Sequence, residues 1–341
     1  MLITENMNNF LDPAILFFAF GILAGCLKSN LEIPPPISRF LSLYLLMALG
    51  LKGGFALAHS GLTAEIVTSL GCAVLLAILI PLGAYRLLTR FLSGFNAAAV
   101  AATYGSVSAV TFISATQYLD VQGIAYGGHM AAAMALMESP AIVIAVVLAN
   151  TLRQSGAAAS VLPAADGTAA LGGGPGQRVG LGKILHESFT DGTQLLLLGA
   201  MLVGLLTGEA GKAAMAPFSV DLFKGMLAFF LLDMGLLTAR NLGKLREQSR
   251  WLLAYAAGAP LVHAGLALGL AFLFSLSTGN AALLMVLAGS ASYIAVPAAL
   301  RYAIPEASPS VYFSMSLGVT FPLNILAGIP LYTWIAGAVL G

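Results

Sequence analysis

Apolar positions in this chain come in long runs that are separated by short polar connections. A helix needs about 20 mostly apolar residues to cross a bilayer. The pattern therefore predicts an all-α polytopic membrane protein with ten transmembrane helices, over residues 12–27, 38–56, 63–90, 95–118, 124–152, 193–208, 219–240, 250–276, 279–302 and 307–339. The fifth and tenth segments are longer than a bilayer requires, so we expect them to tilt or kink.

The longest polar connection covers residues 153–187 and divides the chain into two parts. It contains Gly172-Gly173-Gly174-Pro175-Gly176 together with several Ala and Ser residues, which is typical of a flexible linker. It lacks the Gly-Lys-Ser/Thr ending of a phosphate-binding loop. We therefore expect a first five-helix unit over 1–152, a linker, and a second five-helix unit over 188–341.

Composition supports a protein immersed in membrane lipid. The chain is 59% hydrophobic and only 9% charged, whereas soluble domains carry about 25% charged residues. Its net charge of +1 gives no sign of nucleic-acid binding. Cys26 and Cys72 both lie in apolar runs, and neither has the spacing of a disulfide or metal site. We expect no cofactor and no enzymatic activity.

Basic residues set the predicted orientation, because Lys and Arg concentrate in cytoplasmic loops. With both termini outside, three of the lysines face outside: Lys52, Lys212 and Lys224. Twelve basic residues then lie inside: Lys28, Arg39, Arg86, Arg90, Arg153, Arg178, Lys183, Arg240, Lys244, Arg246, Arg250 and Arg301. This asymmetry predicts that both termini are outside and that the linker is cytoplasmic.

The two halves of the chain repeat one another at a nearly constant offset of 182 to 185 residues. The matched pairs are Gly21 and Gly25 with Gly204 and Gly208, Gly50-Leu51 with Gly235-Leu236, Asn96-Ala97-Ala98 with Asn280-Ala281-Ala282, Gly105-Ser106-x-Ser108 with Gly289-Ser290-x-Ser292, and Pro140 with Pro322. An odd number of helices per unit makes the second unit enter the membrane from the opposite side. The pattern therefore predicts inverted repeats, an architecture of secondary transporters.

The two Gly-Ser-x-Ser stretches are the predicted anion-binding site. Gly and Ser are weak helix formers, so we expect broken helices at 95–118 and 279–302, the fourth and ninth. The N-terminus of each half-helix offers free N–H groups and the positive end of its dipole. The predicted substrate-binding residues are Gly105, Ser106, Val107, Ser108, Gly289, Ser290, Ala291 and Ser292. Close helix packing through small residues is the alternative explanation.

Glu138 is the clearest ionisable residue inside a predicted span, and such residues are functional candidates. Pro140 frees a backbone carbonyl nearby, and a carboxylate among carbonyl and hydroxyl oxygens suits a hard cation such as Na⁺. The equivalent region around Pro322 is also rich in oxygen-bearing side chains. The predicted sodium site consists of Glu138, Ser139, Thr103, Thr320 and Asn324.

Two further interpretations involve charged or titratable residues. Lys52 and Asp233 lie two residues from equivalent glycines, which suggests a structural ion pair between the second and seventh helices. His129 and His263 have no partner at metal-ligand spacing, so we expect both to be packed and hydrogen-bonded. An intramembrane serine hydrolase that uses one Gly-x-Ser serine with His263 is a rival of another class.

Several stretches give the chain a resemblance to the cyanobacterial-type sodium-dependent bicarbonate transporters. They are Gly50-Leu51-Lys52-Gly53-Gly54, Gly105-Ser106-Val107-Ser108, Ser139-Pro140-Ala141, Leu300-Arg301-x-x-Ile304-Pro305 and Pro309-Ser310-x-Tyr312. The resemblance covers essentially the whole chain. It implies a core domain with two crossing broken helices, a separate gate domain and a homotrimer, as in folds similar to bile-acid symporters and sodium/proton antiporters. It also implies bicarbonate near the crossing, Na⁺ alongside, and a PII-like regulatory protein as a cytoplasmic partner.

The resulting hypothesis is a Na⁺-driven bicarbonate symporter of the bacterial plasma membrane, in which Na⁺ is the coupling ion. Two features depart from the family: Tyr293 occupies a position where some cyanobacterial members carry an acidic residue, and the central linker is shorter. A Na⁺- or proton-coupled transporter of another small organic anion keeps the same fold and remains an alternative.

Overall fold

The structure is a computed structural model that describes residues 12–61, 63–159, 192–245 and 248–341. All regular elements in these ranges are helices, which confirms the predicted all-α class. Seven helices among the described residues are long and apolar enough to cross a membrane, and two shorter apolar helices accompany them. The chain is therefore a membrane protein.

The first half of the chain contains six helices in the described residues, and they follow the predicted segments closely. They are α2 (Pro13–Cys26), α3 (Pro35–Ser60), α4 (Ala64–Leu88), α5 (Gly94–Gly105), α6 (Ala109–Gln122) and α7 (Met130–Ala159). The fourth predicted helix is thus interrupted between α5 and α6. The fifth starts six residues later than predicted, and it runs past Pro140 into the first residues assigned to the linker. The rest of the linker, from residue 160, lies outside the described residues.

The second half is also helical throughout its described length. Its elements are α9 (Gly192–Ala216), the π-helical turn η1 (Pro217–Asp221), α10 (Phe223–Leu245), α11 (Arg250–Leu273), α12 (Thr278–Ala288), α13 (Ala295–Ala303), α14 (Pro309–Met315), η2 (Ser316–Thr320), α15 (Phe321–Leu323), η3 (Asn324–Gly328) and α16 (Ile329–Leu340). The tenth predicted helix therefore contains two π-helical turns around Pro322. Such turns are common at functional sites.

The connection predicted between the sixth and seventh helices is itself helical, which corrects the assigned boundaries. The helix α9 continues to Ala216, and η1 joins it almost directly to α10. The change of direction occurs inside α9 at Gly208, whose φ of 53° lies in the left-handed region. Glycine adopts this conformation without steric cost, so the helix bends at Gly208 and the residues expected to form a loop after it are helical.

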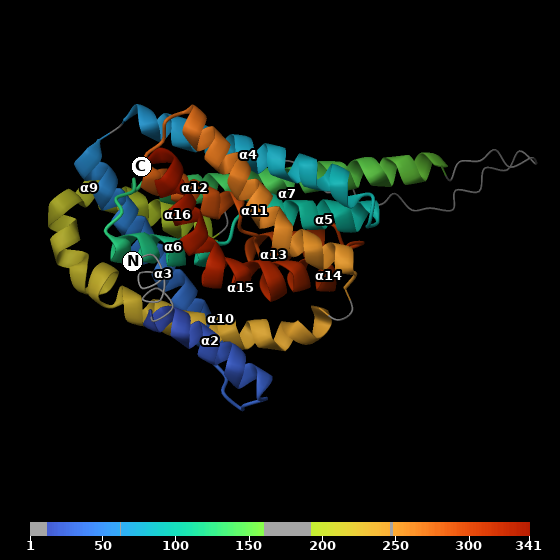
Figure 1. Cartoon of the computed structure of the whole chain (residues 1–341), viewed down its shortest axis with the longest axis horizontal. Helices are drawn as coiled ribbons and strands as arrows, with labels where there is room; N and C mark the ends of the chain where they lie inside the picture. The colour runs from blue at the N-terminus through green and yellow to red at the C-terminus, as the bar shows by residue number, and fades with distance from the viewer. Residues whose placement is uncertain (1–11, 62, 160–191, 246–247) are drawn as a thin grey trace, which may run out of the picture.

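Two helix pairs with glycine contacts form one side of the molecule. Figure 1 shows α9 and α10 as an arc along one edge, with α2 beside α10, whereas α4, α5, α7 and α11 lie together on the other side. The helix α2 packs against α10, and α3 packs against α9. At the first contact a Cβ on Gly21 would lie 3.0 Å from the Cα of Gly235. At the second a Cβ on Gly204 would lie 3.1 Å from the Cα of Gly54.

Two asparagines link the halves of the chain in matching ways. Asn96, near the start of α5, accepts a hydrogen bond at Oδ1 from the backbone N–H of Ser308 at 2.7 Å. Asn280, near the start of α12, accepts one at Oδ1 from the N–H of Gly127, also at 2.7 Å. Each asparagine therefore holds the connection that follows the interrupted helix of the other half. This arrangement fixes α5 and α12 relative to one another around the interrupted stretches.

A bidentate ion pair ties the end of α7 to the connection between α13 and α14. Arg153 donates from Nε to Glu306 Oε1 and from Nη2 to Glu306 Oε2, both at 2.7 Å. Nη2 also donates to the carbonyl of Ala303 at 3.0 Å. The Arg153 guanidinium holds the pKa of the Glu306 carboxyl below its usual range.

This ion pair predicts an acid-dependent component of stability. Because the folded protein lowers the pKa of Glu306, the pair stabilises the fold above the unfolded pKa, and that stabilisation is lost as the pH falls through the lowered pKa. Glu306→Gln should therefore lower the free energy of unfolding at pH 7 by about 1 kcal/mol or less, since Glu306 is partly exposed. Thermal unfolding of both proteins at pH 7 and pH 3 measures this difference. A difference of the same size at both pH values would contradict it.

Candidate functional site

The two interrupted helices meet through backbone hydrogen bonds. The chain leaves helical conformation at residues 106–108 and again at 289–294. The N–H of Ser108 donates to Ser290 Oγ at 2.9 Å, and the N–H of Ser292 donates to the carbonyl of Thr103 at 2.8 Å. Backbone groups freed by a break in a membrane helix need such partners. The two predicted stretches, 184 residues apart in sequence, therefore lie against each other in the interior.

Serine side chains accept hydrogen bonds from the first turns of the helices that follow each break. Ser108 Oγ accepts hydrogen bonds from the N–H of Thr111 at 3.2 Å and from its hydroxyl at 2.9 Å, and so caps the start of α6. Ser292 Oγ accepts from the N–H of Val296 at 3.3 Å at the start of α13. The Ser108 cap fixes where α6 begins, and the Ser292 hydroxyl ties the first turn of α13 to the second break. Both helix starts are consequently held beside the crossing point.

A small cavity lies between these two helix starts. Its volume is about 50 Å³, and the first residues of α6 and of α13 both line it, namely Ser108, Ala109, Ile294 and Ala295. One water needs about 10–15 Å³ by this measure, so the cavity has room for roughly the few heavy atoms of a small ion. The N-terminal ends of helices carry partial positive charge. Two such ends facing one space favour an anion without a basic side chain.

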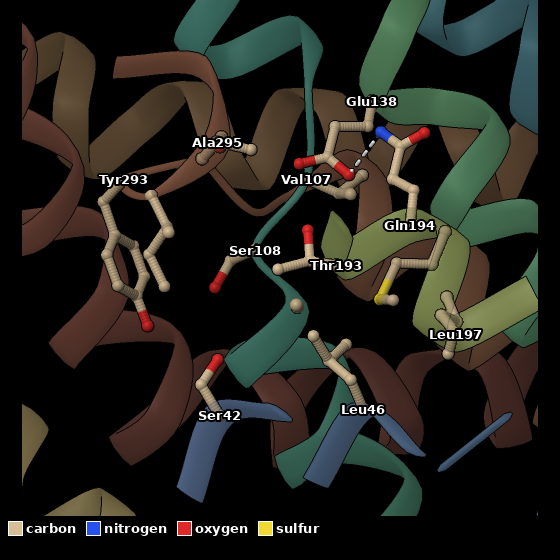
Figure 2. Close-up of a pocket in the computed structure, with 14 residues that line it drawn as sticks. Ser42, Leu46, Val107, Ser108, Glu138, Thr193, Gln194, Leu197, Tyr293 and Ala295 are labelled. Carbon is tan, nitrogen blue, oxygen red and sulfur yellow. Dashed lines mark hydrogen bonds between the residues drawn. The ribbon is translucent and has the colours of Figure 1, made fainter. Parts of the chain in front are cut away.

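Glu138 is the charged side chain among the described residues that line this cavity. Figure 2 shows its carboxylate pointing into the same space as Ser108, Thr193 and Tyr293. Gln194 donates a hydrogen bond from Nε2 to Glu138 Oε2 at 2.8 Å, which fixes the orientation of the carboxylate. A carboxylate repels a second anion nearby. An ionised Glu138 therefore disfavours an anion in this cavity, and a cation beside the carboxylate would relieve that repulsion.

The eight residues predicted to bind the anion are all buried, but they fall into two groups. Val107, Ser108 and Ser292 line the cavity. Five others do not line it and lie in the packed crossing: Gly105, Ser106, Gly289, Ser290 and Ala291. A Cβ on Gly105 would lie 2.7 Å from the ring of Pro81, so this glycine serves close packing. Ser106 Oγ is buried and has no hydrogen-bond partner among the described residues.

The five residues of the predicted sodium site have different surroundings, and Glu138 alone lines the cavity. Thr103 donates its hydroxyl to the carbonyl of Ala99 at 2.9 Å, and Ser139 is buried beside Glu138 in α7. Thr320 Oγ1 lies 2.6 Å from Tyr104 Oη. Asn324 donates to the carbonyl of Gly289 at 2.8 Å, and thereby reaches the second break from the π-helical turn η3.

Lys52 and Asp233 do not form the predicted ion pair in this structure. Lys52 Nζ lies 3.2 Å from Asp120 Oδ2 in α6 and 4.3 Å from the ring centre of Phe223, whereas Asp233 accepts a hydrogen bond from Ser38. Ser38 and Lys52 are separated by about 21 Å along α3, at 1.5 Å per residue. Asp233 therefore contacts α3 near its start, whereas Lys52 lies in the second half of the same helix.

Sequence reasoning did not identify several polar residues that line the cavity. Ser42 lies in α3, and Thr193 and Gln194 lie at the start of α9. All three are polar residues in or beside long apolar runs, and that position alone could have marked them. Tyr293, noted as a departure from the family pattern, lines the cavity as well. Its ring packs edge-on against Phe321 with centroids 5.1 Å apart.

The geometry does not support a serine–histidine catalytic pair. His263 contacts the ring of Tyr104, with centroids 6.5 Å apart, and it is hydrogen-bonded to the carbonyl of Ala288. Ser290 Oγ donates to the carbonyl of Leu287 at 2.9 Å and accepts from Ser108. A nucleophilic serine needs its hydroxyl within hydrogen-bond reach of a base. The hydroxyl of Ser290 is instead hydrogen-bonded to backbone groups where the two interrupted helices meet.

Two interrupted helices that meet beside a small cavity, in a protein with several membrane-spanning helices, are an arrangement that suits a membrane transport protein. The model of the Na⁺-dependent bicarbonate transporter superfamily matches residues 13–337, so the chain belongs to this family. The predicted resemblance and the predicted absence of enzymatic activity are thereby confirmed, and Na⁺ is the coupling ion of the family. No curated protein sequence matches the chain.

Proposed function

We propose that this protein is a Na⁺–bicarbonate symporter that binds its anion in the cavity between the starts of α6 and α13. The observation that carries the proposal is the convergence of two helix N-termini, one of them capped by Ser108, and Glu138 on one small cavity. The helix ends attract the anion, and Na⁺ beside Glu138 offsets the repulsion between the carboxylate and the anion. Occupancy of one ion thereby favours occupancy of the other.

We further propose ten transmembrane helices in two inverted repeats, with breaks in the fourth and ninth. The matching contacts of Asn96 and Asn280 with the opposite half support this proposal. So does the exchange of partners by which α2 packs on α10 and α3 packs on α9. Movement of α4–α7 with α11–α16 against these four helices would alternate access to the cavity. Both termini lie outside the bacterial plasma membrane in this proposal.

The direct test is uptake of labelled bicarbonate by proteoliposomes that hold the purified protein. We expect uptake to require an inward Na⁺ gradient and to fall when the gradient is abolished. Equal uptake with and without Na⁺ would contradict the symport mechanism. Competition by acetate or pyruvate at bicarbonate-like concentrations would instead favour an organic anion, although a cavity of about 50 Å³ favours the smaller ion.

The double change Ser106→Val with Ser290→Val should weaken bicarbonate binding about tenfold or more. Loss of Ser290 Oγ leaves the buried N–H of Ser108 without its acceptor, which costs about 1–3 kcal/mol. The start of α6 would shift and the cavity would lose its shape. The matched control is Ser69→Val with Ser314→Val, at buried serines without hydrogen-bond partners among the described residues. Uptake measured over a series of bicarbonate concentrations compares the two double variants. An equal loss of bicarbonate affinity in the test and control variants would refute the role assigned to Ser290 at the cavity.

The resemblance adds two proposals about assembly: a homotrimer, and a PII-like regulatory protein bound at the cytoplasmic face. Mass measurement of the detergent-solubilised protein tests the first. Co-purification with a PII-like protein from the same genome tests the second.

A further inference from the structure

A second, larger cavity adjoins the transport cavity. Its volume is about 1060 Å³, and it opens widely to the surface. Four residues line both cavities: Ser42, Thr193, Tyr293 and Ile294. The larger cavity, called the vestibule below, is therefore the passage between the transport cavity and one face of the protein. Figure 2 shows three of the shared residues, Ser42, Thr193 and Tyr293, around the smaller cavity.

Three arginines from three different helices line the vestibule. Arg39 lies near the start of α3, Arg240 near the end of α10 and Arg301 near the end of α13. All three are exposed, and none forms an ion pair with a described residue. The orientation predicted from basic residues places all three on the cytoplasmic side. The lining contains no Asp or Glu among the described residues.

The acidic side chains around the vestibule offset only part of this charge. Asp233 interacts electrostatically with Arg240, but its carboxylate accepts a hydrogen bond from Ser38 and does not line the vestibule. Glu306, which follows α13, is held in the bidentate pair with Arg153. The vestibule therefore keeps an excess of positive charge, and Ser38, Ser310 and Asn241 add hydrogen-bonding groups to its wall.

We propose that the vestibule binds a small, multivalent, phosphate-bearing anion. The guanidinium group matches phosphate through two parallel hydrogen bonds and stays charged at every physiological pH. Even if Asp233 offsets one of the three guanidinium charges, the two that remain exceed what a monovalent anion can neutralise. The volume of about 1060 Å³ is at the upper end of the range for small-molecule sites. This site differs from the transport cavity, which has no Arg or Lys among its lining residues.

A ligand in the vestibule would cover the shared residues and close the route between the transport cavity and the cytoplasm. We therefore expect such a ligand to inhibit uptake, an expectation that rests on the proposed transport function. Binding itself does not rest on that function, because it depends on the arginines alone.

The test is titration calorimetry of the full-length protein in neutral detergent, with pyrophosphate as the probe. We expect saturable binding that weakens as ionic strength rises, and at least tenfold weaker binding after Arg39→Gln, Arg240→Gln and Arg301→Gln are combined. The matched control is Arg90→Gln, an exposed arginine outside the vestibule. Each single variant is measured too, so that the result stands if the triple variant does not fold. Absence of pyrophosphate binding, or equal affinity in all variants, would overturn the proposal.

Two further experiments complete the test. The first distinguishes a lipid headgroup from a free phosphate compound as the ligand, and the second separates ligand binding from transport. Phosphatidic acid added to phosphatidylcholine nanodiscs should displace pyrophosphate if a lipid headgroup reaches the site, and should leave it bound if the ligand is free in solution. Both results retain the phosphate chemistry of the vestibule. The Ser106→Val with Ser290→Val protein should still bind pyrophosphate although its uptake is reduced. Failure of uptake in the wild type with pyrophosphate binding intact would refute the transport proposal and keep the vestibule.

Discussion

Glu138→Gln is expected to abolish Na⁺-dependent uptake while the protein remains folded. Glu138 is the only charged side chain that lines the transport cavity among the described residues. The substitution keeps the size of the side chain and one of its two oxygens, but it removes the negative charge that would attract Na⁺ beside the anion. Two opposite unit charges 4 Å apart interact by about 4 kcal/mol at an effective dielectric constant of 20. Loss of even half of this coupling would reduce Na⁺ binding by more than tenfold.

The measurement is uptake of labelled bicarbonate over a series of Na⁺ concentrations in proteoliposomes. Glu209→Gln is the matched control, since Glu209 is exposed and pairs with Lys212 and His59 away from the transport cavity. We expect wild-type behaviour for this control and no Na⁺ response for Glu138→Gln. An unchanged Na⁺ response in Glu138→Gln would show that Na⁺ binds elsewhere.

Gly204→Ala is expected to destabilise the protein by about 1–3 kcal/mol, the usual cost of overpacking a tight interior. Its new methyl group would lie 2.6 Å from the carbonyl oxygen of Leu51 and 3.1 Å from the Cα of Gly54. Both neighbours are backbone atoms of α3, so neither can move aside by a change of rotamer. The helices α3 and α9 would have to separate along their whole contact.

Gly199→Ala, on the same helix α9, is expected to have the opposite effect on stability. Gly199 is exposed, and a Cβ there would meet no atom within 4 Å. Alanine is favoured over glycine in a helix by about 1 kcal/mol, so Gly199→Ala should leave stability unchanged or raise it. Thermal unfolding of the two variants in one detergent compares them directly. A similar midpoint for both would contradict the assigned role of Gly204 as a helix contact.

Local sequence carried most of the information about helices and breaks. Apolar runs of about 20 residues have few alternatives to a spanning helix in lipid. Clustered Gly and Ser, together with the repeat offset, placed both breaks correctly at Ser106–Ser108 and Gly289–Ile294. The boundary around Gly208 was harder to predict, because a single left-handed glycine kinks α9 while the residues that follow it stay helical.

The interaction partners of polar and charged residues could not be predicted from their positions in the sequence alone. Lys52 and Asp233 are close to equivalent glycines in sequence, yet the structure pairs Lys52 with Asp120 and Asp233 with Ser38. The distance of a residue from the crossing decides which partner it meets. Thr320 and Asn324 belong to the predicted sodium site through the equivalence of the regions around Pro140 and Pro322, and in the structure they contact Tyr104 and Gly289.

The sequence by itself determined the class of protein, the helix segments, the two crossing stretches and Glu138 as the charged residue to examine. Those features depend on local composition and on repetition, which a linear chain displays. Only the tertiary structure decided that Ser108 and Ser292 line the cavity while Ser106 and Ser290 lie in the crossing behind it. It also brought Ser42 and Gln194 to the cavity and gathered three arginines in one vestibule. Such groupings depend on which faces of distant helices meet, and close packing between helices sets those faces.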